Sequence, residues 1–220
     1  MLAIRMSVAA ASGLAAAALW GMGLTAWAPL LHGGGHAHAA PGLTAAPWLA
    51  GWGLMVTAMM LPAAGPLVGA VERHRGLVVV AYLGAWLTLG VAALAAAALV
   101  GSAALPVALA AAGAHQFTPH KRRALARCRG QRRLADVASG DPSGDAIRAG
   151  LAHAAATMRC CGPLMALMVL GLGGPAWMLL LGGAMAAEAA TPLGARLRVP
   201  LGLLLLLASL LVLWTGPPPG

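Results

Sequence analysis

Charged and aromatic residues are scarce in this sequence. Lys, Arg, Asp and Glu make up 9% of the 220 residues, and only five residues are acidic. The net charge of +9 does not indicate a nucleic-acid-binding surface, because the charges lie between apolar runs and aromatic residues are only 4% of the chain, with one Phe, one Tyr and seven Trp. Three cysteines are too few for a disulfide framework. We therefore expect no nucleic-acid partner and no disulfide-stabilised fold.

Motifs of covalent catalysis are also missing. The sequence contains no phosphate-binding Gly loop, no Ser/His/Asp constellation and no HExxH motif. We therefore expect a protein that is not an enzyme and that acts by binding.

Apolar residues, by contrast, are abundant. They make up 60% of the chain, and the mean hydropathy is +0.84. Apolar runs of about 20 residues predict membrane-spanning helices rather than a soluble core. We expect an all-α, polytopic transmembrane helix bundle that forms a single domain over residues 1–220, with close packing of Gly and Ala between helices. Seven spans are predicted, the first of them retained rather than cleaved, at residues 7–31, 48–71, 77–100, 103–116, 149–172, 175–193 and 199–214.

The positions of the charges predict the topology. Seven spans place Arg5, the turn 72–75, the basic loop 120–148 and the pair Arg196/Arg198 on one side, and they leave the other side without Lys or Arg. Under the positive-inside rule the N-terminus lies inside and the C-terminus outside, which we expect in a bacterial inner membrane. The basic loop, with a Gly/Asp/Pro/Ser turn near its end, would also attract anionic lipid headgroups.

The stretch 153–168 concentrates nitrogen and sulfur donors inside a predicted span. Each helical residue advances by about 100°, so His153, Thr157, Cys160, Cys161 and Met168 share one face. Imidazole, thiolate and thioether ligands favour a soft metal, with Cu(I) preferred over Zn(II) because of the methionine. The alternative is that Cys and Met only fill space between helices.

A straight helix cannot bring all these donors to one metal. His153 and Cys160 are separated by about 10 Å along the axis. Pro163 removes the hydrogen bond to the Arg159 carbonyl and is expected to kink the helix. Further ligands would have to come from neighbouring spans.

Other spans supply candidates for these ligands. Met59 and Met60 could contribute thioethers, or could pack around a kink in their helix. His115 is placed near the inner surface, together with Glu188, a carboxylate within a span. Such a carboxylate is a functional candidate because it is costly to bury in lipid. It could bind a cation, carry a proton, or pair with Arg159.

Two further groups lie outside the predicted spans. Cys128, in the basic loop, is either a free cytosolic thiol or one that receives and releases metal. His32, His36 and His38 could capture a cation loosely at the outer surface, or could belong to a plain polar loop.

Three motifs give the chain a resemblance to a known family. They are MVTAMMLPAAGP at 55–66, HQFTPHKRRALARCRG at 115–130 and HAAATMRCCGPLM at 153–165. Together they resemble the bacterial "predicted metal-binding integral membrane protein" family over about residues 48–198. The chain departs from the pattern at Thr157, Arg159 and Gly162. The resemblance implies metal binding, but it implies no reaction.

We therefore expect an integral membrane protein that binds, translocates or delivers a soft transition metal, with copper favoured. His153, Cys160 and Cys161 would be the principal ligands, and lipid, metal ion and metal-delivery proteins the partners. Two alternatives remain open. One is a metal-free accessory or structural membrane subunit, and the other is a proton-coupled small-solute permease that uses Glu188 and His153.

Overall fold

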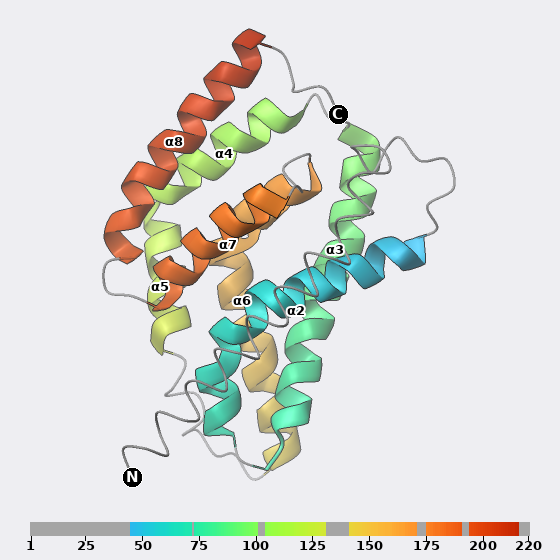
Figure 1. Ribbon diagram of the computed structural model, residues 1–220. Helices are drawn as coiled ribbons and strands as arrows, with labels where there is room; N and C mark the ends of the chain where they lie inside the picture. Colours follow the sequence, from blue (N-terminus) through green and yellow to red (C-terminus); the bar gives the residue numbers. More distant parts are fainter. Residues whose placement is uncertain are drawn as a thin grey trace.

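The computed structural model describes residues 45–71, 73–100, 104–130, 141–170, 175–190 and 194–215. These residues form helices and no strand, which confirms the predicted all-α class (Figure 1). The first predicted span and the cluster of His32, His36 and His38 lie outside the described residues. The helices are α2 Ala45–Ala70, α3 Arg75–Val100, α4 Leu105–Phe117, α5 Pro119–Gly130, α6 Pro142–Val169, α7 Pro175–Ala190 and α8 Gly194–Thr215.

Helix α6 lies at the centre of the bundle. It packs extensively against α3 and also contacts α4, α5 and α7. Helix α8 packs mainly on α4, at the side of the molecule away from α3 (Figure 1). The donor-rich stretch 153–168 therefore lies on a helix that several other elements can reach.

The structure corrects the prediction of seven spans. Among the described residues, only two segments are long and apolar enough to cross a membrane, Arg75–Ala93 in α3 and Arg196–Thr215 in α8. Helix α4 has 13 residues and α7 has 16. At about 1.5 Å per residue these helices reach about 20–24 Å, short of a hydrocarbon core of about 30 Å. The apolar segments found in α2 and α7, Leu49–Leu61 and Ala176–Glu188, are likewise short.

Helix α6 is long enough to span a membrane but is interrupted by polar groups. It has 28 residues and begins at Pro142, seven residues before the predicted start. The end of the predicted Gly/Asp/Pro/Ser turn is the start of this helix. The Asp141 side chain caps it by accepting a hydrogen bond from the Ser143 N–H at 3.1 Å. Pro142 occupies the first turn, where a missing N–H costs nothing. The first turns of α6 thus carry charged side chains that the predicted span did not contain.

Small residues allow the central helices to approach closely. A Cβ atom on Gly150 of α6 would lie 2.6 Å from the Val78 carbonyl oxygen of α3. A Cβ atom on Gly90 of α3 would meet the Trp52 indole at 2.3 Å. That indole crosses from α2 and donates a hydrogen bond to the Trp86 carbonyl at 3.0 Å. Glycine is therefore required at both positions, and α2, α3 and α6 form one closely packed group.

Candidate metal site

The turn between α4 and α5 is built by Thr118 and Pro119. A residue before proline avoids the helical conformation, and Thr118 is extended, with φ −69° and ψ 146°. Its hydroxyl donates to the His115 carbonyl at 2.8 Å and accepts from the Lys121 N–H at 3.1 Å. Thr118 therefore ends α4 and caps the N-terminus of α5. The change of direction turns the first residues of α5 towards α6 and α7.

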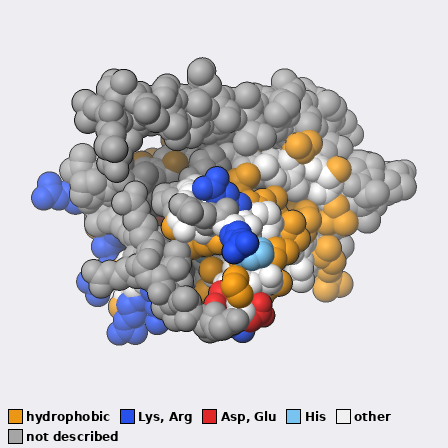
Figure 2. Space-filling model, turned by 90° about the horizontal axis from the view of Figure 1, so that it is seen from below, with side chains coloured by type: hydrophobic (Ala, Val, Ile, Leu, Met, Phe, Trp, Pro, Cys, Tyr) orange, Lys and Arg blue, Asp and Glu red, His pale blue; other side chains and the backbone are white. Residues whose placement is uncertain are grey.

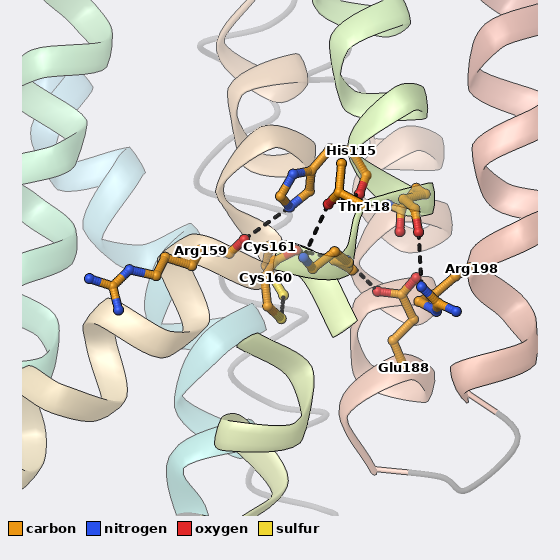
Figure 3. A network of polar contacts seen from close by, with 9 residues as sticks. His115, Thr118, Arg159, Cys160, Cys161, Glu188 and Arg198 are labelled. Carbon is orange, nitrogen blue, oxygen red and sulfur yellow. Dashed lines mark hydrogen bonds and ion pairs between the residues drawn. The ribbon is translucent and has the colours of Figure 1, made fainter. Parts of the chain in front are cut away.

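Lys121 is buried by this turn, although it lies in the most basic stretch of the chain. Its side chain is 0% exposed, and Nζ lies 2.6 Å from a Glu188 carboxylate oxygen. The same ammonium group donates to the Cys160 carbonyl at 2.7 Å (Figure 3). The pairing of Glu188 with Arg159, one of the alternatives that the sequence left open, is not formed, because Arg159 is exposed and points away from this network. Lys121 reaches Glu188 because α5 packs against both α6 and α7.

Pro163 has no N–H, so the Arg159 carbonyl lacks its hydrogen bond within the helix, as predicted. The structure shows which side chain binds this carbonyl instead. Helix α6 continues through Pro163 to Val169. The Arg159 carbonyl, four residues earlier, accepts a hydrogen bond from His115 Nε2 at 3.0 Å. Two adjacent carbonyls of α6, at Arg159 and Cys160, are therefore bound by side chains from α4 and α5. His115 uses Nε2 for this contact, so it supports the backbone beside the cysteines.

The three cysteines of the chain come together next to this network. Cys160 Sγ lies 3.0 Å from Cys161 Sγ, and both residues are buried on α6. Cys128, from α5, packs against the buried cluster that contains Cys160 and Cys161 and interacts with Cys160. Cys128 is half-buried, so the row runs from a partly accessible thiol to two inaccessible ones. The interaction with Cys160, together with burial, raises the pKa of the Cys128 thiol well above its ordinary value.

His153 lies on the same helix but makes no polar contact. It is 2% exposed, and neither ring nitrogen has a hydrogen-bond partner among the described residues. Its ring packs against Tyr82 of α3, with centroids 5.4 Å apart. The Thr157 hydroxyl, one turn further on, donates to the backbone carbonyls of His153 and Ala154 on its own helix and not to the His153 ring. A buried imidazole with two unsatisfied nitrogens is costly without a ligand.

The candidate methionines also lie in the core. Met59 and Met60 of α2 and Met168 of α6 belong to the same buried cluster as Cys160 and Cys161. This cluster is rich in other methionines, which are Met55, Met165, Met178 and Met185. Thioethers are soft, weak donors that repack readily, so these residues suit both core packing and transient contact with a soft cation.

The predicted site residues are gathered only in part. Within the described ranges, no three His, Cys, Asp or Glu side chains are arranged to hold a metal ion. Cys160 and Cys161 are in contact, while Glu188 is engaged by Lys121 and His115 by a carbonyl. Sequence reasoning left the contribution of Cys128 open and missed that of Lys121. The signal for both was the Thr-Pro pair, which predicts a break that brings α5 against α6.

A second backbone contact ties α8 to this region. Arg198 donates to the Gln116 carbonyl at 3.1 Å (Figure 3). The Gln116 side-chain amide is 1% exposed and, in the part of the chain that the structure describes, has no hydrogen-bond partner. The C-terminal end of α4 is thus fixed between α6 and α8.

Comparison with known proteins gives one match. Residues 49–212 match the model of a family described as copper chaperone, PpoB2. No curated protein and no solved structure matches the chain significantly. The match covers most of the chain, including every described residue of the thiol row and of the Lys121 network, and it supports the metal-related part of the resemblance seen in the sequence. The chain belongs to the PpoB2 copper chaperone family.

Proposed function

We propose that the protein binds Cu(I) as cargo through the thiols of Cys160 and Cys161 and delivers it while anchored in the bacterial inner membrane. The observation that carries this proposal is the contact of the two buried thiols at 3.0 Å, in a chain that belongs to a copper chaperone family. Thiolates are the ligands that Cu(I) prefers, and the surrounding thioethers reinforce this preference. The proposed activity is binding and transfer, without catalysis.

A buried ammonium group, that of Lys121, lies beside the proposed metal site and also pairs with Glu188. Two thiolates that bind one Cu(I) leave a net negative charge in an apolar core, which is costly unless it is compensated. The Lys121 ammonium group, bound to the Cys160 carbonyl, lies beside the thiols. Cys160 and Cys161 must lose their protons when metal binds, and the two sulfurs must move apart to admit it. The candidates His153, Met59, Met60 and Met168 are proposed as supporting donors, and Glu188 as the partner that holds Lys121 in place.

Two helices support the membrane anchor. Helices α3 and α8 contain the two candidate spans, and both carry Arg at or near their N-terminal ends. Seen from below, the space-filling view shows Lys and Arg side chains at the left edge and near the middle, beside apolar side chains (Figure 2). Basic residues at one end and apolar helices above them suit a protein held at the inner side of a bilayer.

The first experiment is metal analysis of anaerobically purified protein. We expect about one equivalent of copper in the wild type after loading with Cu(I), and loss of that copper in Cys160→Ser/Cys161→Ser. Thr157→Ser, a change on the same helix face, should retain the copper. Size-exclusion chromatography and circular dichroism would confirm folding. A well-folded double variant with unchanged copper content would refute the proposal.

A metal-free accessory subunit is the second candidate. It is favoured by the lack of a three-ligand cluster among the described residues and by the structural contacts of Glu188 and His115. In that case the wild type and the double variant would both lack copper after loading, while a partner subunit would co-purify with each of them.

A further inference from the structure

The three thiols form a row rather than a cage. Cys160 lies in the middle: its sulfur contacts the Cys161 sulfur at 3.0 Å, and Cys128 packs against the same buried cluster from α5 and interacts with Cys160. If the three sulfurs were ligands of one resident metal, they would surround a common centre, and no such group exists in the described ranges. A row with a partly accessible end is instead the arrangement that ligand exchange needs.

We propose that Cys128 is the exchange thiol through which Cu(I) enters and leaves the buried Cys160/Cys161 pair. This inference rests on the proposed function and adds the route that the metal takes. In the release step, the Cys128 sulfur bonds to the Cu(I) held by Cys160 and Cys161, and the bond from copper to the Cys161 sulfur then breaks. The proton lost by Cys128 is matched by the proton that Cys161 regains. Copper remains Cu(I) throughout, so no oxidant or reductant is needed.

Several contacts place Cys128 for this step. Helix α5 starts at the turn made by Thr118 and Pro119, and Lys121 fixes its first turn to α6 and α7. Cys128 lies two turns further along α5 and packs against the core that contains Cys160. Cys161 is 4% exposed and Cys160 1%, so neither can meet an external acceptor directly. Of the three thiols, Cys128 alone combines contact with Cys160 and partial exposure.

Transfer kinetics test the proposal. Protein loaded anaerobically with Cu(I) is mixed with excess bathocuproine disulfonate, a coloured Cu(I) chelator, and the rate of colour formation is followed. We expect Cys128→Ser and Cys128→Ala to retain about one equivalent of copper but to release it at least tenfold more slowly than the wild type. Ala126→Ser, which adds a hydroxyl at an exposed position of the same helix, should release copper at the wild-type rate.

Three other outcomes would each overturn the exchange role of Cys128. Equal release rates in the wild type and in folded Cys128 variants would overturn the exchange role and leave the proposed copper site intact. Loss of copper from folded Cys128 variants would make Cys128 a resident ligand and overturn the exchange role as well. A wild-type protein that takes up no copper would overturn the proposed function together with this inference.

Discussion

Lys121 and Glu188 form an ion pair in which both side chains are fully inaccessible. Removing one partner of such a pair leaves an uncompensated buried charge, whereas replacing both by apolar residues is often tolerated. We therefore expect the stability of the metal-free protein to fall when one of the two residues is replaced, but not when both are replaced by apolar residues.

Lys121→Met should lower the free energy of unfolding by about 3–5 kcal/mol, and Lys121→Met/Glu188→Met should recover most of that loss. Chemical denaturation in detergent micelles would measure both. The exposed pair of Arg148 and Asp145 serves as a control, and its removal should leave stability unchanged. Coupling of Glu188 with Arg159 instead of Lys121 would contradict the structure.

His153 provides a second test at this scale. Because neither of its buried ring nitrogens has a described partner, His153→Leu should stabilise the metal-free protein by about 1–3 kcal/mol. If the imidazole supports copper binding, the same variant should hold copper more weakly in a chelator competition. Thermal unfolding with and without Cu(I) separates the two effects. A destabilised metal-free variant would show instead that the imidazole has a satisfied structural role.

For single residues, the sequence predicted which groups need a hydrogen-bond or charge partner better than it predicted which residue supplies that partner. The free Arg159 carbonyl followed from Pro163 alone, since a missing N–H is a local property. Its donor, His115, lies 44 positions away, and the pairing depends on how α4 crosses α6. The partner of Glu188 could not be predicted for the same reason, because depth in a span does not say which helix faces the carboxylate.

At the scale of helices, the turn at Thr118 sets where α5 points. Thr118→Val should remove the cap of α5 and lower stability by about 0.5–2 kcal/mol, while Thr118→Ser should restore it. Hydrogen exchange would show faster opening of the α5 amides in the valine variant. Copper release should also slow in this variant, because Cys128 would no longer be held against Cys160. Unchanged exchange in α5 would show that the cap contributes little.

Helix positions were largely predictable, whereas their relation to the membrane was not. The predicted span 77–100 corresponds to α3, and 199–214 corresponds to the greater part of α8, because both are continuous apolar runs. The predicted spans 103–116 and 175–193 correspond to α4 and α7, which are too short to cross. Hydropathy identifies apolar helices but does not separate lipid-facing helices from those buried among other helices.

For the molecule as a whole, the described basic residues and the direction of α3 and α8 predict one orientation. Arg73 and Arg75 lie where α3 begins, and Arg196 and Arg198 lie in the first turns of α8. Both helices run towards the upper end of the molecule in Figure 1, where the described parts of α3 and α8 carry no Lys or Arg. The positive-inside rule then places the start of each helix in the cytoplasm and the end of α8 outside.

Single cysteines introduced into a Cys128→Ser background test this orientation. In intact cells, a membrane-impermeant maleimide should label Thr215→Cys, at the end of α8, but should label Arg73→Cys only after the cells are lysed. The reason is that moving the Arg-rich ends across the bilayer is far costlier than moving the uncharged ends. Equal labelling of both positions before lysis would mean that α3 and α8 do not span the membrane. The bundle would then be a peripheral copper carrier, and the apolar surface of its helices would have to be buried against something other than the lipid core.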